Sequence, residues 1–447
     1  MKEQNLQRRL GLFPATNIVI ANMIGAGIFT TSGLLIAELN DPILMLVLWI
    51  AGGIIALCGA LSYGELGAAM PGAGGEYLFL SKLFHPIFGF LSGWVSFVVG
   101  FSAPVAASAM GFSEYFCRAT PFIPDYLSVT GIFEPATTKK LISASVIILF
   151  TSIHYRGINT GVVIQNILTL LKVSLILFLL LAGFLSGDGN ISHFTSDKAI
   201  ATGFPGLKAT GLSLMWIMFA YSGWNASTYL GAEIKCPSRV LPRSLILGTI
   251  IVVILYMGIN ILYVYAIDPY EMKGVISVGG LAMGKLFGGS AEILFSLLIA
   301  FALFSSLSAF IIIGPRVYYS MAKDGLFFKS VALINPKSGV PSNSILLQGI
   351  IAVILALSGT FEQVLTYMGF ALGIFPILTV LSVIKLRKTN ASAHRIAGYP
   401  FTQVIYVMTG VLILILSFLE RPHESGVAIL TVLAGIPAYY LFKKRIK

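Results

Sequence analysis

The sequence predicts an all-α polytopic membrane protein with twelve transmembrane helices, and three observations lead to this fold class. Of the 447 residues, 57% are hydrophobic and 11% are charged, whereas a soluble domain has about 45–50% apolar and about 25% charged residues. Apolar stretches long enough to cross a bilayer recur along the whole chain. Lysine and arginine gather in alternate connections between these stretches, as they do in membrane proteins.

Twelve apolar stretches are the candidate spans. One of them, 140–154, is shorter than the roughly 20 residues that a membrane helix needs, so we expect it to begin before Lys139. The glycine-rich stretch 268–289 is only partly apolar and is predicted to form a surface helix and a loop. The spans cover residues 11–35, 43–70, 86–117, 140–154, 158–185, 205–233, 243–267, 290–322, 343–359, 363–385, 402–419 and 425–442.

The placement of basic residues predicts the orientation of the chain. An even number of spans puts both termini on one side, where the loops carry 20 of the 29 lysines and arginines, against 8 in the opposite loops. Cytoplasmic loops are the ones enriched in Lys and Arg, so both termini are predicted to be cytoplasmic, in a cell (inner) membrane. This placement also accounts for the net charge of +11, and we expect no nucleic-acid partner.

The first span is interrupted by glycines near its middle. Gly25 and Gly27 lie in a stretch, 10–36, that contains no charged residue. A helix that unwinds there releases N–H and C=O groups that hydrocarbon cannot satisfy. Freed amides suit a carboxylate, and freed carbonyls suit an ammonium group or a cation. Close packing of small residues between helices is the alternative interpretation.

The sixth span has a similar interruption, because small and polar residues fill its middle in the stretch 219–226. Two interrupted helices that each open a group of five spans indicate an inverted repeat, since five is odd and the second group enters from the other side. Alternatively, Trp224 is an interfacial anchor and Asn225 bonds a neighbouring helix. The predicted division is a cytoplasmic N-terminus 1–10, repeats 11–185 and 205–388, two additional helices 400–442, and a cytoplasmic C-terminus 443–447.

Lys172 is the only basic residue deep inside a predicted span. An ammonium group in the membrane is costly enough to suggest a function. The alternative is that its side chain extends to the interface, but the position is central in its span. As a buried amine, Lys172 is also a candidate proton carrier.

Other charged and reactive residues give weaker signals. The three cysteines and five histidines are dispersed, which predicts no disulfide framework, no metal site, no cofactor and no enzymatic activity. Acidic residues near predicted cytoplasmic helix ends form an inner gate or are solvated helix-end charges. The acids are Glu65, Glu76, Glu233 and Asp324, and the nearby bases are Lys235, Arg239 and Lys323.

Motifs along nearly the whole chain resemble the amino acid, polyamine and organocation transporter superfamily, and within it bacterial relatives of the L-type (light-chain) amino acid transporters. The resemblance implies a leucine-transporter-like fold of five plus five helices with two more at the C-terminus. It also implies an amino acid as substrate. The motifs are GAGIF at 25–29, MPGAGGEY at 70–77, GW at 93–94, FAYSGWN at 219–225, AEIK at 232–235, GPRV at 314–317, MAKDG at 321–325 and GYP at 398–400.

The resemblance assigns roles to residues at the two interruptions. The substrate carboxylate is expected at the amides of Ala26 and Gly27. Its ammonium group is expected at backbone carbonyls around Ile24 and near Phe219, Ala220 and Ser222. Lys172 matches a lysine that replaces a sodium ion in sodium-independent members. The other expected residues are the substrate-binding Phe219, Ala220, Ser222 and Asn225, with Phe219 and Trp224 as gates.

These assignments predict a sodium-independent transporter for small neutral L-amino acids that works by alternating access, as an exchanger or a proton-coupled carrier. Close relatives often have glycine at position 222. The larger side chain of Ser222 would shrink the pocket for the substrate side chain, so we expect small substrates to be preferred. A cationic amino acid or polyamine permease is the alternative, and a sensor or a channel is the alternative from another class. The expected partners are the amino acid, protons and the bilayer. Because Cys117 matches the external linking cysteine of animal relatives poorly, no obligatory heavy-chain partner is expected.

Overall fold

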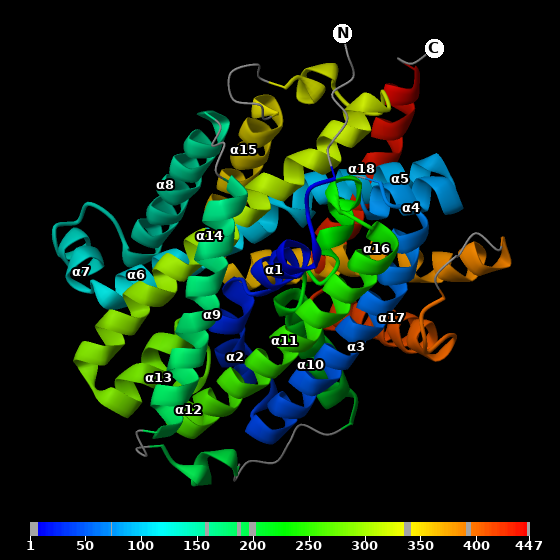
Figure 1. Ribbon diagram of the computed structural model, residues 1–447. Helices are drawn as coiled ribbons and strands as arrows, with labels where there is room; N and C mark the ends of the chain where they lie inside the picture. Colours follow the sequence, from blue (N-terminus) through cyan, green and yellow to red (C-terminus); the bar gives the residue numbers. More distant parts are fainter. Residues whose placement is uncertain are drawn as a thin grey trace.

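The computed structural model describes residues 8–72, 74–156, 161–185, 189–195, 203–334, 341–389 and 395–444. Over these residues the chain is almost entirely helical, and its only β pairing is an isolated bridge between Leu10 and Ile234. Most of the long helices pack together in one bundle. The first helix begins on the side of the bundle where the last helix ends (Figure 1). The all-α fold class is therefore confirmed.

The first half of the chain contains five expected spans. The third of them includes a π-helical segment, and short helices lie between spans. The elements are α1 (Leu12–Met23), α2 (Ala26–Leu39), α3 (Pro42–Ala69), α4 (Glu76–Leu83), α5 (Pro86–Val95), the π-helix η1 (Ser96–Gly100), α6 (Ser102–Ala119), α7 (Phe122–Val129), α8 (Pro135–Arg156), α9 (Gly161–Leu185) and the 3₁₀ helix η2 (Ile191–Phe194).

The second half contains the other seven expected spans. Its elements are α10 (Gly203–Ala220), the 3₁₀ helices η3 (Ala226–Tyr229) and η4 (Gly231–Glu233), α11 (Pro237–Ala266), α12 (Pro269–Met272), α13 (Val278–Phe287), α14 (Gly289–Lys323), the 3₁₀ helix η5 (Lys329–Ala332), α15 (Ser342–Ser358), α16 (Phe361–Lys388), α17 (Phe401–Glu420) and α18 (Pro422–Lys444).

Ten helical segments in the described ranges are long and apolar enough to cross a membrane, when α1 with α2, and α5 with η1 and α6, are each taken as one. The shorter α10 and α15 occupy the remaining two of the twelve predicted spans. As expected, the fourth span begins well before Lys139, at Pro135. The short helices α12 and α13 lie where a surface helix and loop were predicted, but Val278 and Ala282 of α13 are buried, so α13 is part of the packed core.

The first interruption is short. Helix α1 ends at Met23 and α2 begins at Ala26, so only Ile24 and Gly25 leave the helical path. The second is longer, because α10 ends at Ala220 and the chain continues through a turn into the 3₁₀ helices η3 and η4. Both breaks confirm the sequence prediction, and after the second break the sixth span continues to Glu233 as 3₁₀ turns and not as an α-helix. Gly223, at φ +97°, turns the backbone into a region that other residues rarely adopt.

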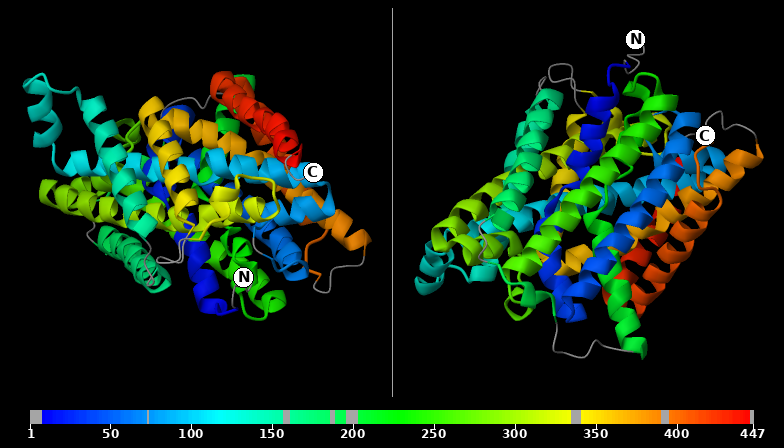
Figure 2. Two further views of the ribbon diagram at one scale, coloured as in Figure 1. Left: turned by 90° about the horizontal axis from the view of Figure 1, so that it is seen from above. Right: turned by 60° about the horizontal axis from the view of Figure 1, so that its bottom comes forward.

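Each of the two predicted five-span repeats opens with its broken helix, and most of the helices in one repeat pack against the corresponding helix of the other repeat. The contacts pair α2 with α10, α3 with α11, α6 with α14, and α8 with α15. Parts related by a twofold axis meet through equivalent surfaces, so this pairing fits an inverted repeat with the two breaks near its centre. Helix α7 projects from the edge of the bundle beside α8 (Figure 2), while α17 and α18 cover the opposite edge.

Candidate functional site

The two helix breaks are in direct backbone contact. A Cβ added to Gly27, in the first turn of α2, would lie 2.6 Å from Cα of Ala220 at the end of α10. A Cβ on Gly223 would lie 2.8 Å from the carbonyl carbon of Asn22 in α1. Since real Cβ atoms do not approach other atoms so closely, glycine at both positions lets the breaks meet.

A buried lysine binds the first break. The Lys172 side chain is 1% exposed, and its Nζ donates to the carbonyl of Ile24 at 2.6 Å and to Oγ of Ser306 at 2.7 Å. Ser306 Oγ also donates to the Ile24 carbonyl, at 2.9 Å. Lys172 of α9 therefore joins the break to α14. The Ile24 carbonyl already accepts two hydrogen bonds in this arrangement.

A tyrosine that sequence reasoning missed connects both breaks. Tyr256 of α11 is fully buried, and its hydroxyl lies 2.6 Å from the carbonyl oxygen of Met23 and 3.0 Å from that of Ala220. These are the last carbonyls of α1 and α10, which have no partner within their own helices. A single phenol thus joins the two helix ends. A tyrosine inside a long apolar helix gives no distinctive sequence signal.

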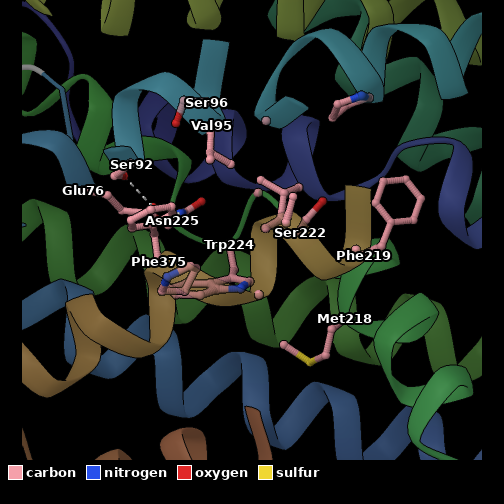
Figure 3. A pocket seen from close by; sticks show the side chains of 18 of the residues that line it. Glu76, Ser92, Val95, Ser96, Met218, Phe219, Ser222, Trp224, Asn225 and Phe375 are labelled. Carbon is pink, nitrogen blue, oxygen red and sulfur yellow. Dashed lines mark hydrogen bonds between the residues drawn. The ribbon is translucent and has the colours of Figure 1, made fainter. Parts of the chain in front are cut away.

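A cavity opens beside the second break. Figure 3 shows Phe219, Ser222, Trp224 and Asn225 around it, and all four were predicted as site residues. The other predicted site residues do not line this cavity. Four of them belong to the two breaks and the helix ends beside them, and the fifth, Lys172, binds the first break. They are Ile24, Ala26, Gly27, Ala220 and Lys172.

Trp224 and Asn225 are held by their surroundings. The Trp224 ring packs edge-on against Tyr63 of α3, with ring centroids 4.7 Å apart. The Asn225 amide nitrogen donates to Glu76 Oε1 at 2.9 Å and to the hydroxyl of Tyr229 at 3.3 Å. Asn225 therefore anchors the turn after α10 to helix α4.

The acidic residues expected at the inner helix ends have other partners than Lys235, Arg239 and Lys323. Arg387 makes a two-pronged ion pair with Glu65, at 2.6 and 2.7 Å. Arg316 of α14 lies 3.3 Å from Glu233 of η4. The remaining two acids accept hydrogen bonds from tyrosines: Asp324 from Tyr77, and Glu76 from Tyr63 at 2.7 Å. Within the described ranges, no group of three or more His, Cys, Asp or Glu side chains could hold a metal ion.

Two interrupted helices that meet at a repeat interface, beside a cavity, define the class of secondary transporters built from inverted repeats. The sequence profile of the amino acid permease family matches residues 10–437. The chain therefore belongs to this amino acid permease family, and it is a multi-pass membrane protein.

Three mammalian relatives match almost the whole chain. The b(0,+)-type amino acid transporter 1 of Mus musculus is 27% identical over 446 residues, which are 99% of this chain and 89% of that protein. The Asc-type amino acid transporter 1 of Mus musculus is 27% identical over 98% of this chain and 81% of its own length. The large neutral amino acids transporter small subunit 2 of Homo sapiens is 26% identical over 98% of this chain and 80% of its own length.

The last of these relatives corrects one expectation. We expected no obligatory heavy-chain partner, but a protein that matches nearly the whole chain is, by its name, the small subunit of a transporter. That expectation rested on the poor match of Cys117 to a linking cysteine. The argument from Cys117 fails because helices in a membrane also associate through packing and hydrogen bonds. A missing cysteine for a disulfide therefore does not decide whether a second subunit is needed.

Proposed function

We propose that this permease carries small neutral L-amino acids across the cell membrane by alternating access, without sodium, as an exchanger or together with protons, and that both termini are cytoplasmic. The three relatives are amino acid transporters by name. The excess of basic residues in the terminal-side loops supports the orientation.

The contact between Lys172 and Ile24 carries the proposal of sodium independence. Carbonyls at the end of an interrupted helix attract cations. The Ile24 carbonyl accepts a hydrogen bond from the Lys172 ammonium group at 2.6 Å. A cation of the protein itself therefore lies where a bound cation would contact this carbonyl. A sodium ion there would meet a fixed positive charge at close range.

The amino acid head group fits the two breaks through opposite helix ends. Helix α2 starts at Ala26 with no side chain capping its N-terminus, and such uncapped N–H groups favour a carboxylate. Helix α10 ends at Ala220 and presents carbonyls that favour an ammonium group. For a zwitterion to enter, the contact between Gly27 and Ala220 has to open, which is the movement that alternating access requires.

One observation favours the alternative substrate class of cationic amino acids or polyamines, because the carboxyl group of Glu76 lines the cavity. Its Oε1 already accepts hydrogen bonds from Tyr63 and Asn225. A cationic head group would have to replace these donors, so we favour neutral substrates.

The test is flux in proteoliposomes. We expect labelled alanine, serine or threonine to enter faster when the vesicles contain unlabelled amino acid, and to enter equally well with choline in place of sodium. Lysine and putrescine in the same panel test the alternative class. Uptake that requires a sodium gradient would overturn sodium independence, binding without flux would indicate a sensor, and flux with no stimulation by internal substrate would favour a channel.

A further inference from the structure

We propose that the carboxyl group of Glu76 is a proton-binding site on the inner side of the second break, and that it takes up one proton with each amino acid carried inward. This rests on the proposed function and names the group that couples protons to it. The proton binds to Oε2 of the carboxylate and leaves toward the cytoplasm as the cavity empties.

The first reason is that Glu76 is buried without a positive partner. It is the first residue of α4, its side chain is 7% exposed, and it lines the same cavity as Ser222 and Asn225. Among the side chains that the structure describes, no lysine, arginine or histidine forms an ion pair with it. An isolated buried carboxylate is costly, so its protonated form is within reach.

The second reason is the unequal surroundings of its two oxygens. Oε1 accepts from the Tyr63 hydroxyl at 2.7 Å and from the Asn225 amide at 2.9 Å. Oε2 has one partner among the described residues, the Ser92 hydroxyl at 3.3 Å. A hydroxyl can donate or accept. When Oε2 carries a proton, it can donate to Ser92 while Oε1 keeps both of its donors, so the site satisfies both protonation states (Figure 3).

The third reason is that the groups facing Glu76 are neutral near pH 7. The phenols of Tyr63 on α3, Tyr229 on η3 and Tyr406 on α17 interact with its charge, and phenols do not ionise near neutral pH. Burial raises the pKa of the Glu76 carboxyl above its ordinary value, while the hydrogen bonds from Tyr63, Ser92 and Asn225 oppose that rise.

The basic residues on the packed elements have other positions. On α16, which packs against α4, Arg387 binds Glu65 and Lys385 lies over the ring of Phe84. Lys388 of α16 and Lys82 of α4 itself are exposed. None of the four therefore neutralises Glu76, and proton uptake is the available way to remove its charge.

Glu76 also contacts a segment that we expect to move during transport, the turn after α10. Asn225 belongs to the turn after α10, and its amide bonds Oε1 of Glu76 directly. A displacement of this turn changes how many donors the carboxylate has. Fewer donors favour the protonated form, so the charge of Glu76 responds to the conformation of the second break.

The experiment compares Glu76→Gln with wild type in proteoliposomes whose membrane potential is clamped to zero. One pH unit, acid outside, can drive about tenfold accumulation of a solute that moves with one proton. We expect this response in wild type and its loss in Glu76→Gln, while exchange at equal pH persists. The glutamine resembles the protonated acid, because its amide donates to Ser92 and its oxygen accepts from Tyr63 and Asn225. Glu271→Gln is the matched control, since Glu271 pairs with Lys285 at 2.6 Å away from the cavity, and it should keep the response.

Each result decides the matter. A pH response that persists in Glu76→Gln overturns the proposal and directs attention to Lys172. Wild-type exchange without any pH response overturns it too, but leaves amino acid transport intact, whereas no flux of any amino acid overturns both. If Glu76→Gln does not fold, infrared difference spectra of wild type and Ser92→Ala replace it. The C=O band of the protonated acid should appear on acidification, and it should appear at a higher pH in Ser92→Ala, because the carboxylate has lost the Ser92 hydroxyl as a donor. An unshifted band contradicts the proposal.

Discussion

The two helix breaks have different constructions although they occupy equivalent places in the two halves. At the first, two residues leave the helix and the α-helix resumes at once at Ala26. At the second, the α-helix does not resume before α11, and 3₁₀ turns bring Asn225 against Glu76. The first break is a narrow gap fixed by Lys172, and the second is a wide gap that lines the cavity. If the head group binds between the two breaks as proposed, the second break alone adds the side chains that line the cavity beside it.

The largest effect is expected where the two breaks meet. In Gly27→Ala the new methyl group would lie 2.6 Å from Cα of Ala220, so the breaks must separate. Overpacking of this kind costs about 1–3 kcal/mol, and amino acid exchange should fall by about tenfold or more. Gly25→Ala is the matched control, because its nearest neighbour would be at 3.8 Å. Equal losses of exchange in both variants would rule out the contact as the cause.

The next effect concerns the lysine at the first break. Lys172→Ala leaves the Ile24 carbonyl with Ser306 as its remaining donor. A hydrogen bond to a charged group contributes about 1.5–3 kcal/mol, so exchange should fall roughly tenfold and the melting temperature should drop. Lys208→Ala removes a lysine from an ion pair with Glu420 that is partly exposed, and it should have little effect on either measurement. Wild-type exchange by Lys172→Ala would mean that this break needs no fixed cation.

A smaller effect is expected for the phenol that joins the breaks. Tyr256→Phe removes a hydroxyl that reaches Met23 and Ala220, at a cost of about 0.5–1.5 kcal/mol. Tyr263→Phe, about two turns further along α11, is the control, because among the described residues the Tyr263 hydroxyl is buried without a hydrogen-bond partner. We expect lower exchange and lower thermal stability in the first variant only. The same loss in both would show that the aromatic environment, and not the link between breaks, is what matters.

The smallest effect belongs to the second break and is one of selectivity. Ser222→Gly enlarges the cavity, so uptake of leucine and phenylalanine should rise relative to alanine. The gain should be about threefold, below the value of a methylene in a closed pocket, because Ser222 is only half-buried. Ser222→Ala separates the volume of the side chain from its hydroxyl. An unchanged preference in Ser222→Gly would refute the pocket argument.

Much of this arrangement could be predicted from local sequence, because its signals are local. Gly25 and Gly27 stand out within an uncharged span, Gly223 stands out in the sixth, and Lys172 is a charge with no interface nearby. These positions predict breaks and a buried cation wherever the remaining helices lie. The family motifs added the expected roles of the backbone groups, which stay predictions for this chain.

The rest depends on distant segments. The contact of Gly27 with Ala220 joins residues from separate halves, and Tyr256 is one of many aromatic residues in apolar helices. Glu76 follows the second span and was expected among cytoplasmic helix ends, but α4 packs against α5 and α16 and buries it. The order of polar residues along the chain could not reveal that packing.

The pairing of most helices with their counterparts in the other repeat has an energetic consequence. Where related halves face opposite sides of a membrane, exchanging their conformations turns an outward-open molecule into an inward-open one with similar internal contacts. The two orientations then have similar free energies, and a difference of about 1.4 kcal/mol already shifts their populations tenfold. If the permease works by alternating access as proposed, its resting orientation is set by contacts that the two repeats do not share, such as the one from Lys172 to Ile24.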